Sequence, residues 1–213
     1  RLFLACATVL FLSLSYFLIP TLYNKELVQL QIQNQIFKKY EIKIKFNKRI
    51  NYGLLPKPHF IAKDLSIMRN DKEIGISKNF KIFISAGNFL DMNNINTKDL
   101  ILKNTDFNIK KNDYIFFESL LKTEPNENKI KIKNSNIFFK NKNDEVLFIN
   151  KIADSQFYYD QNKLQNIFVS KNKIFNVPYK LKIENDKFNK KFYSKFSSKR
   201  IRLNIDNEFD YDE

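Results

Sequence analysis

The sequence predicts a mainly β protein, in which one N-terminal transmembrane helix precedes a curved, groove-like antiparallel β-sheet carrying two or three short helices. Two patterns predict this fold: an uncharged apolar run opens the chain, and short stretches of alternating apolar and polar residues fill its later part. The composition agrees, because 15% aromatic residues is too many for a disordered chain, despite the high charge. Alternation alone does not decide whether the apolar face is an open groove or a closed core.

The apolar run extends from Leu2 to Ile19 and contains no charged residue. About 20 such residues cross the hydrocarbon core of a bilayer, so the run predicts a retained membrane anchor. A cleaved signal peptide is the alternative, but its apolar region is about 7–15 residues long and is followed by small residues. This run is longer and is followed by Pro20. The residues assigned to the anchor are Leu2, Phe3, Leu10, Phe11, Phe17 and Leu18.

The segment after the anchor predicts a second helix. Its apolar residues fit one broad helical face and are Leu27, Val28, Leu30, Ile32, Ile36 and Phe37. Pro20 is expected to kink the junction between the two helices. We therefore divide the chain into an anchor (1–20), a juxtamembrane helix (21–40) and a β-domain (41–213). Because residue 1 is Arg and not Met, we expect the chain to belong to a longer reading frame, so the domain is a candidate for truncation.

The β-domain begins where the apolar period changes to two. Glu41–Phe46 alternates strictly, and similar short stretches recur as far as Ile201–Ile205. Such runs, bounded by Asn, Asp, Lys or Gly, predict antiparallel strands with one buried face. Two segments break the alternation and predict short helices, Ser85–Met92 and Asp113–Lys122. Asp113 is expected to be the N-cap of the second one.

A weak repeat runs through this domain. LILKNTDFNIKK starts at Leu100 and IKIKNSNIFFKN starts at Ile130, and shorter copies start at Leu181 and Leu203. Leu102 and Phe107 are five positions apart, so an unbroken strand would place them on opposite faces. A turn or bulge at the Asn-Thr-Asp of the first copy would keep both on one face. Each copy is therefore interpreted as a strand, a tight turn or bulge, and a second strand.

Residue patterns of known catalytic and metal sites are missing from the sequence. His59 is the single histidine, and the single cysteine, Cys6, lies in the anchor, which argues against a zinc site. The three glycines do not form a phosphate-binding loop, and no serine occupies a nucleophile elbow. We therefore predict a non-enzymatic protein without a catalytic residue, metal or cofactor.

The net charge of +14 leaves three interpretations open. They are a solvated exterior, attraction to anionic lipid head groups, and a nucleic-acid surface. The lysines are spread along the chain and alternate with apolar residues, as in Ile42–Phe46, so they do not form one patch. The aromatic residues occupy apolar strand positions, where core packing is expected, and not an exposed stacking platform. We therefore expect no nucleic-acid partner.

The order of features carries a family resemblance. The first strand is followed by the proline-containing segment Tyr52–Phe60, which leads into Ala62–Ile67. Lys81–Asn88 and Ile95–Leu102 then provide a strand, a small helix and a further strand. This order, over about Leu2–Phe139, resembles the N-terminal region of the AsmA-like family of Gram-negative inner-membrane proteins. The chain departs from the family in its high lysine and asparagine content.

The resemblance implies a single-pass protein of the bacterial inner membrane with most of the chain in the periplasm. It implies a role in outer-membrane assembly or in envelope lipid transport and homeostasis. The partners would be phospholipid or another envelope lipid, the inner membrane and outer-membrane assembly proteins. The lipid-groove candidates are Leu100, Leu102, Phe107, Ile109, Ile130, Ile132, Ile137 and Phe139. The alternative is a membrane-tethered scaffold with a closed β-core, which binds another envelope protein by strand addition at a sheet edge.

Overall fold

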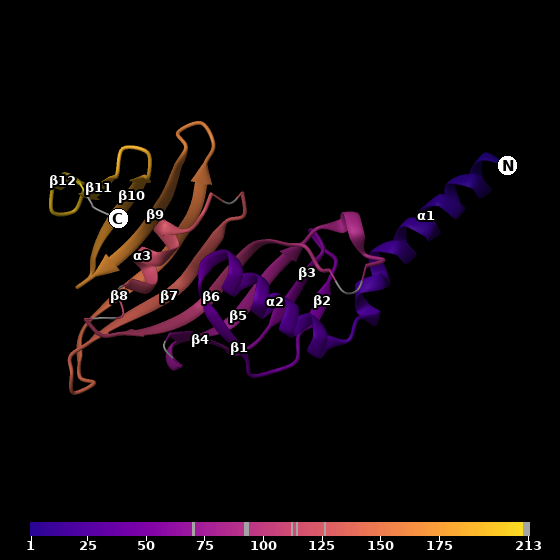
Figure 1. Ribbon diagram of the computed structural model, residues 1–213, viewed down its shortest axis with the longest axis horizontal. Helices are drawn as coiled ribbons and strands as arrows, with labels where there is room; N and C mark the ends of the chain where they lie inside the picture. The colour runs from indigo at the N-terminus through magenta and orange to yellow at the C-terminus, as the bar shows by residue number, and fades with distance from the viewer. Residues whose placement is uncertain (70, 92–93, 112, 114, 126, 211–213) are drawn as a thin grey trace.

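The computed structural model describes residues 1–69, 71–91, 94–111, 113, 115–125 and 127–210. The side chains of Leu2, Asn88 and Ser119 lie outside this description, so the assignment of Leu2 to the anchor is not examined further. An apolar N-terminal helix is followed by a large open sheet with a few short helices, and 52% of the described residues are in strands (Figure 1). The mainly β fold class predicted from the sequence is confirmed.

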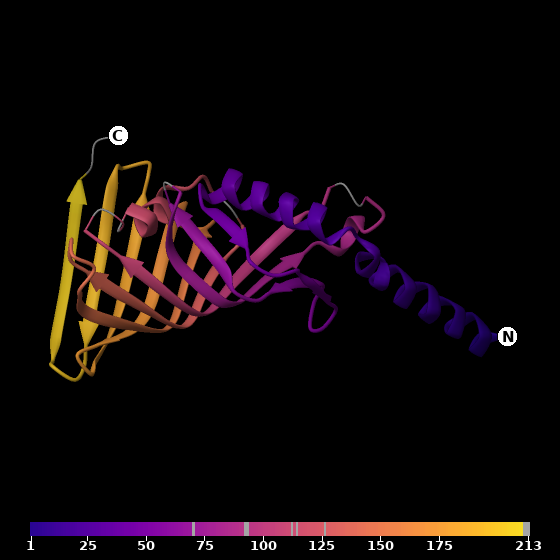
Figure 2. The ribbon, with the colours of Figure 1, turned by 90° about the horizontal axis from the view of Figure 1, so that it is seen from below.

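The N-terminal helix α1 (Leu2–Leu18) extends away from the domain (Figures 1 and 2). The stretch Phe3–Leu22 is long and apolar enough to cross a membrane, and little of it is buried within the protein. Pro20 lies in the short 3-10 helix η1 (Ile19–Leu22), where the chain changes direction before the next helix (Figure 1). Four of the anchor residues expose their side chains: Phe3, Leu10, Phe11 and Leu18.

The last turn of α1 is fastened to the domain. The Tyr16 ring stacks on Phe89 with 5.4 Å between ring centroids, and its hydroxyl donates to the Ala86 carbonyl oxygen at 2.8 Å. The Tyr52 hydroxyl donates to the Phe17 carbonyl oxygen, also at 2.8 Å. The anchor residue Phe17 is consequently partly buried against the domain core. These contacts fix the direction in which α1 leaves the sheet.

The second helix, α2 (Lys25–Tyr40), lies on one face of the sheet (Figure 2). The Asn24 side chain caps the first turn of α2 by accepting hydrogen bonds from two backbone N–H groups. The helix ends at Glu41, whose backbone is left-handed with φ of 57°. The buried residues are four positions apart: Val28, Ile32, Ile36 and Tyr40. The predicted broad apolar face is wrong in part, because a helix that covers one sheet buries only the stripe that faces it. The residues left exposed on the opposite side are Leu27, Leu30 and Phe37.

The described residues form a 12-stranded sheet, in the order β1-β4-β5-β6-β7-β8-β9-β10-β11-β12, with β2 paired to β3 and β3 to β5. The strands are β1 (Lys43–Phe46), β2 (Asn51–Gly53), β3 (His59–Ala62), β4 (Leu65–Arg69), β5 (Lys72–Ile84), β6 (Thr97–Ile109), β7 (Ile130–Lys140), β8 (Val146–Asp160), β9 (Gln165–Ile174), β10 (Val177–Asp186), β11 (Lys191–Ser198) and β12 (Leu203–Asp210). The two predicted short helices are a 3-10 turn, η2 (Ala86–Asn88), and α3 (Ile115–Lys122). Met92, in the first predicted helix, lies outside the described residues.

The prediction of a wholly antiparallel sheet is wrong at one pair, since β6 and β7 run parallel. Parallel neighbours need a crossover connection, and residues 110–129, which include α3, provide it. The sequence repeat coincides with this pair: Leu100 lies opposite Ile130 and Leu102 lies opposite Ile132. The first two copies of the repeat are therefore neighbouring strands in register.

The predicted interruption within each copy is a single left-handed residue, and both halves remain in one strand. Asn104 and Asn134 have φ of 54° and 47°. The predicted turn or bulge is wrong in form, because the pairing register with the neighbouring strands does not shift at these residues. The next residue of the first copy, Thr105, points inward, and its backbone N–H donates to Ser135 Oγ at 3.0 Å. The matching left-handed residues thus keep the apolar residues before and after them on the inner face.

Helices α2 and α3 cover the same face of the sheet and enclose the core. A small apolar cavity within it touches Ile36 of α2, Leu120 of α3 and Leu100 of β6. Beyond β10 no described helix lies over the sheet, and β11 and β12 stand uncovered at the end remote from α1 (Figure 2). The inner face is consequently closed over its first strands and open over its last ones.

Candidate functional site: an apolar trough

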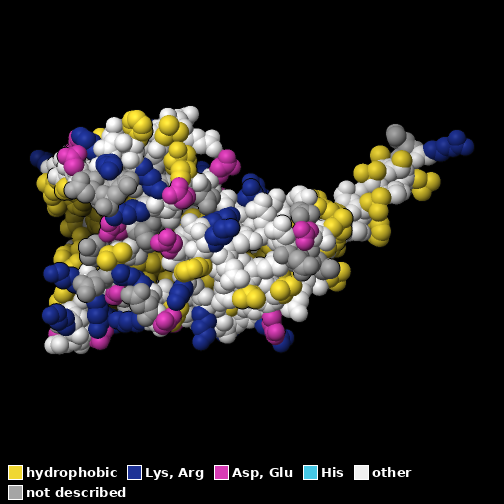
Figure 3. Space-filling model, viewed as in Figure 1, with side chains coloured by type: hydrophobic (Ala, Val, Ile, Leu, Met, Phe, Trp, Pro, Cys, Tyr) yellow, Lys and Arg dark blue, Asp and Glu magenta, His cyan; other side chains and the backbone are white. Residues whose placement is uncertain are grey.

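The open part of the inner face forms a trough with a volume of about 980 Å³. Strands β7 to β11 provide its floor and α3 provides one wall. Apolar side chains dominate the lining, and they include Ile132, Ile152, Phe157, Phe168, Leu181 and Ile183. Figure 3 shows apolar side chains along the side of the molecule where β11 and β12 lie. Ligand pockets occupy about 300–1,000 Å³, so this trough is large enough for a lipid-sized molecule.

The strand register arranges the lining residues in rows that cross the sheet. In one row, Phe157 lies opposite Phe168, with 4.3 Å between stacked ring centroids, and Phe168 lies opposite Ile183. Five strands spaced by about 4.8 Å make a floor about 19 Å wide. A bilayer core about 30 Å thick contains two leaflets, so one acyl chain extends about 15 Å. One acyl chain can therefore lie across the trough.

Helix α3 forms the wall of the trough because its two faces pack differently. Phe117 and Leu121 border the trough, whereas Phe116 and Leu120 border the small cavity of the covered core. The Phe107 ring of β6 contacts both phenylalanines, with ring centroids 5.9 Å from Phe116 and 5.5 Å from Phe117. This aromatic cluster joins the trough wall to the covered core.

Two buried asparagines hold the C-terminal end of α3. Asn166 Nδ2 donates to the carbonyl oxygens of Leu121 and Thr123 at 3.0 and 2.8 Å. Asn185 Nδ2 donates to the Leu121 carbonyl oxygen at 2.8 Å. The last carbonyls of a helix have no partner within the helix, so these amides satisfy acceptors that would otherwise be buried without a donor. The interaction fixes α3 to β9 and β10.

Asp113, expected as the N-cap of α3, has two side-chain contacts before the helix begins. Its carboxylate accepts from the backbone N–H of Lys110 at 3.0 Å and lies 3.5 Å from Arg69 Nη1. Its carbonyl oxygen accepts from the Phe116 backbone N–H at 3.1 Å. Residues 112 and 114 beside it are outside the described part of the chain.

A band of neutral polar groups crosses the trough floor. The hydroxyls of Ser155 and Ser170 are hydrogen-bonded to one another, and Ser170 donates to Asn172 Oδ1 at 2.7 Å. The Tyr179 hydroxyl donates to Asn150 Oδ1 at 3.1 Å, and burial raises the pKa of Tyr179, so it stays neutral at physiological pH. These groups satisfy one another and place no charge on the floor.

Glu118 is the charged residue of the trough lining within the described part of the chain. Its carboxylate lies 2.7 Å from Lys122 Nζ, one turn later on α3. The lining therefore offers hydrocarbon and neutral dipoles to a ligand, and no cation that would select an anionic head group.

The predicted groove residues divide between the trough and the covered core. Ile109, Ile132, Ile137 and Phe139 border the trough, and Ile109, Ile132 and Ile137 are at the same time buried in the core cluster. Leu100, Leu102, Phe107 and Ile130 are buried in the core near α2 and α3 and do not border the trough. The contribution of strands β8 to β12 was missed. The available signal was the third copy of the repeat, whose Leu181 and Ile183 are on the floor.

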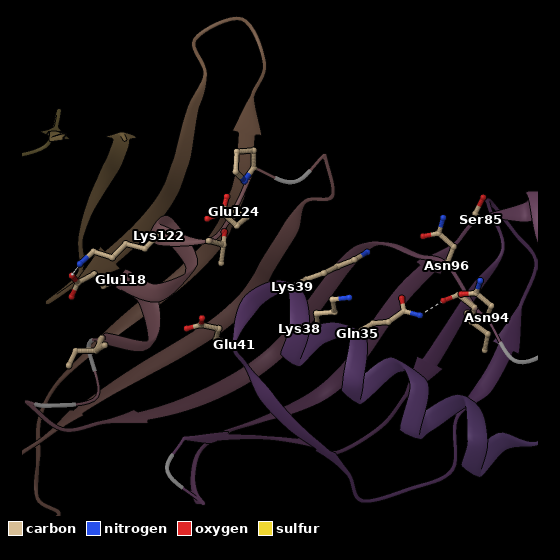
Figure 4. A pocket seen from close by; sticks show the side chains of 14 residues that line it. Gln35, Lys38, Lys39, Glu41, Ser85, Asn94, Asn96, Glu118, Lys122 and Glu124 are labelled. Atoms are coloured by element: carbon tan, nitrogen blue, oxygen red, sulfur yellow. Dashed lines mark hydrogen bonds and ion pairs between the residues drawn. The ribbon is translucent and has the colours of Figure 1, made fainter. Parts of the chain in front are cut away.

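A second hollow, of about 830 Å³, lies between α2 and α3 and is polar (Figure 4). Three lysines and three glutamates line it and balance one another: Lys38, Lys39, Lys122, Glu41, Glu118 and Glu124. Burial and the nearby Lys98 lower the pKa of Lys39, which donates to the Thr97 carbonyl oxygen at 3.0 Å. Gln35 hydrogen-bonds both Ile95 and Thr97. These contacts fasten α2 to the start of β6, so we assign this hollow a structural role.

No family model matches the chain, and a search of curated proteins also found no match. The function is therefore inferred from the membrane-spanning helix, the sheet and the trough.

Proposed function

We propose that this chain is a single-pass inner-membrane protein with an AsmA-like periplasmic domain, whose trough holds acyl chains of a phospholipid or another envelope lipid. Its role would be lipid transport or homeostasis in the envelope, or outer-membrane assembly. The observation that carries the proposal is the uncovered apolar trough of about 980 Å³ on a sheet whose first strands are covered by helices. A soluble domain that needed only a core would have no reason to leave this face open.

The energetics support binding through the hydrocarbon alone. Each buried CH₂ contributes about 0.8 kcal/mol, so a dozen contribute about 10 kcal/mol before costs. Association costs about 4–15 kcal/mol, mainly in lost translational and rotational freedom. The net affinity is expected to be modest, which suits a protein that must also release its lipid. We propose binding and not catalysis, because the charged lining residue, Glu118, is already paired with Lys122.

The position of the trough supports transfer between partners. Strands β8 to β11, which line most of the trough, lie at the end of the domain remote from α1 (Figures 1 and 2). The covered core, which contains Leu102 and Ile130, lies between these strands and the anchor. The ten strands of the continuous path span about 43 Å at a spacing of about 4.8 Å. We expect this domain to pass lipid to or from another protein, and not to bridge the two membranes alone.

Photo-crosslinking in cells tests whether lipid occupies the trough. A photo-reactive phenylalanine analogue at Ile183, on the floor, should form a lipid adduct that mass spectrometry of the purified protein detects. The same analogue at Lys180, on the opposite face of β10, is the matched control and should form none. Equal adduct formation at both positions, or adducts at neither, would contradict the proposal.

A charge substitution then separates loss of lipid from loss of fold. Leu181 lines the trough and is only partly buried, so Leu181→Asp leaves a carboxylate that water can still reach. The domain should keep its circular dichroism spectrum while the Ile183 adduct falls. Lys180→Asp places the same side chain on the outer face and should leave the adduct unchanged. A folded Leu181→Asp protein with undiminished adduct would refute the trough as the lipid site.

A further inference from the structure

Three leucines are strongly exposed on the segments at the base of α1, where this helix joins the domain. Leu22, Leu55 and Leu90 are 80%, 81% and 75% exposed, and they lie in η1, in the loop between β2 and β3, and in the loop after η2. Figure 3 shows apolar side chains gathered where α1 leaves the domain. Single exposed leucines are ordinary on protein surfaces, whereas apolar side chains gathered at one place indicate an interaction surface. We call these three residues the basal leucines.

Hydrogen bonds and ring contacts fasten two of these segments to the last turn of α1. Leu90 follows Phe89, whose ring stacks on Tyr16 with 5.4 Å between centroids and whose backbone N–H donates to the Tyr16 hydroxyl at 3.3 Å. Tyr23, the neighbour of Leu22, donates its hydroxyl to the Phe89 carbonyl oxygen at 2.6 Å. The chain around Leu22 and Leu90 is therefore held against the end of α1.

The third segment is fastened to the same end of α1. Leu55 lies just beyond the end of β2, and β2 contacts η1. The Tyr52 hydroxyl, on β2, donates to the Phe17 carbonyl oxygen at 2.8 Å. Figure 1 shows β2 and β3 at the end of the sheet from which α1 leaves. All three basal leucines therefore belong to the end of the domain that faces the anchor.

These contacts place the basal leucines at the level where the apolar stretch ends. Tyr16, Phe17 and Leu22 all belong to Phe3–Leu22, the stretch that is long and apolar enough to cross a membrane. Segments that pack against the end of this stretch lie beside the bilayer surface when the stretch spans the bilayer. Tyrosine is enriched at membrane–water interfaces, because its ring is apolar and its hydroxyl is polar. Three tyrosine hydroxyls donate to backbone carbonyl oxygens at this end, those of Tyr16, Tyr23 and Tyr52.

The charged residues next to the basal leucines in the sequence have both signs. Lys25 and Lys57 provide positive charges, and Glu26 and Asp91 provide negative ones. These formal charges cancel, so the base of the domain does not select anionic lipid by charge. The two lysines can extend their charged ends toward head groups while their stems stay at the level of apolar groups. The leucines, and not the charges, therefore define the partner of this surface as hydrocarbon.

We infer that the basal leucines insert into the surface of the bilayer that α1 crosses, at the boundary between lipid head groups and acyl chains. Apolar side chains of interfacial segments are buried about 5–10 Å into this boundary. Three leucines are too few to retain the domain alone, since even one myristoyl chain gives only marginal, reversible membrane binding. Their effect is to fix the orientation of the sheet relative to the membrane surface. This inference rests on the membrane-spanning assignment of α1 in the proposed function and is independent of the trough.

Depth-dependent fluorescence quenching in phosphatidylcholine nanodiscs tests the insertion. In the full chain Cys6, the single cysteine, is replaced by serine, and one cysteine at a time is introduced and labelled with a polarity-sensitive fluorophore. The labels of Leu55→Cys and Leu90→Cys should emit at shorter wavelength and lose fluorescence to a nitroxide placed near the head-group end of the acyl chain. Phe188→Cys is the matched control, because Phe188 is 93% exposed in the turn between β10 and β11, at the end of the sheet remote from α1. Its label should not be quenched.

Leu10→Cys, within α1, separates failure of this inference from failure of the membrane-spanning assignment. Its label should be quenched by a nitroxide deep in the acyl chains. If it is not quenched, α1 does not span the bilayer, and both the assignment and this inference are overturned. If it is quenched while the labels of Leu55→Cys and Leu90→Cys behave like the control label, only this inference is overturned.

A charge substitution separates insertion from proximity alone. The fluorophore is attached at Lys57→Cys, close to Leu55, and its quenching by the shallow nitroxide is compared with and without Leu55→Asp. A carboxylate stays hydrated, so the loop should withdraw and the quenching should fall. Leu164→Asp, in the exposed turn between β8 and β9, is the matched control and should leave the quenching unchanged. Because Leu55 is exposed, the circular dichroism spectrum should not change. Undiminished quenching in folded Leu55→Asp would mean that the contacts of α1 alone hold the loop there, and the insertion would be refuted.

Discussion

The attachment of α3 to β9 and β10 provides the sharpest test of how the trough is built. Asn185 is fully buried, and its amide donates to the Leu121 carbonyl oxygen at 2.8 Å. In Asn185→Ala this carbonyl keeps its bond from Asn166, so the change removes the Asn185 bond to Leu121 and a few buried atoms. A neutral hydrogen bond contributes about 0.5–1.5 kcal/mol net. We expect the free energy of unfolding to fall by about 1–2 kcal/mol.

The double variant Asn166→Ala/Asn185→Ala goes further. It removes the three side-chain bonds to the carbonyl oxygens of Leu121 and Thr123 and leaves these acceptors without those donors. At about 1 kcal/mol for each bond the loss is about 3 kcal/mol, within a typical domain stability of about 5–15 kcal/mol. The sheet should therefore remain folded while α3 detaches locally and the trough loses its wall.

Hydrogen exchange followed by mass spectrometry measures this directly. Amides of α3 in the double variant should exchange about 100-fold faster, because each 1.4 kcal/mol of local stability is a factor of about ten. Amides of β5 and β6 should change less. Asn189→Ala is the matched control, since the Asn189 amide makes an equivalent 2.9 Å bond to Asp186 in an exposed turn. Unchanged exchange in α3 of a folded double variant would refute the role of the two asparagines.

Three further outcomes are expected. A chain that begins at Ser15 keeps the Tyr16 contacts and should leave the membrane fraction. The full chain should resist extraction by salt and carbonate, and its extraction would contradict the transmembrane assignment. Asn104→Val should lower stability by about 1–2 kcal/mol in urea denaturation, because a β-branched residue is strained at φ of 54°, whereas Asn104→Gly should be nearly neutral. Burial lowers the pKa of His59, so the unfolded chain binds more protons than the folded one. The free energy of unfolding should therefore fall as the pH drops from about 7 to about 5. His59→Gln should flatten this pH dependence, and an equal slope of unfolding free energy against pH in both proteins would exclude His59 as its source.

Local patterns in the sequence determined the type and place of most elements. The uncharged apolar run specifies a helix that is long and apolar enough to span a membrane. Alternation specifies a strand because successive side chains point to opposite faces. The interruption at Asn104 was also predictable, since Leu102 and Phe107 can share a face only if the alternation of side chains is broken between them. AsmA-like membership, periplasmic location and lipid binding stay predictions.

The direction of strand pairing, parallel or antiparallel, could not be predicted from the local sequence pattern. A strand alternates in the same way whether its neighbour runs parallel or antiparallel, so β6 and β7 could not be assigned from their periodicity. The repeat at Leu100 and Ile130 was the available signal, because similar segments in register have the same left-handed residue at the same height. The buried stripe of α2 could not be predicted from the local sequence pattern either. Its sequence allows a broad face, and only contact with the sheet selected Val28, Ile32 and Ile36 for burial.

The sequence by itself determined that one face of the sheet would be apolar from the first strands to the last. Only the tertiary structure decided which part of that face is core and which part is trough. Leu100 and Leu181 occupy equivalent positions in two copies of the repeat, yet Leu100 is buried and Leu181 lines the trough. The physical reason is the reach of the two helices. The residues on α2 and α3 that cover Leu100 are distant in sequence, whereas α3 is bonded to β10 at Asn185 and leaves Leu181 partly exposed.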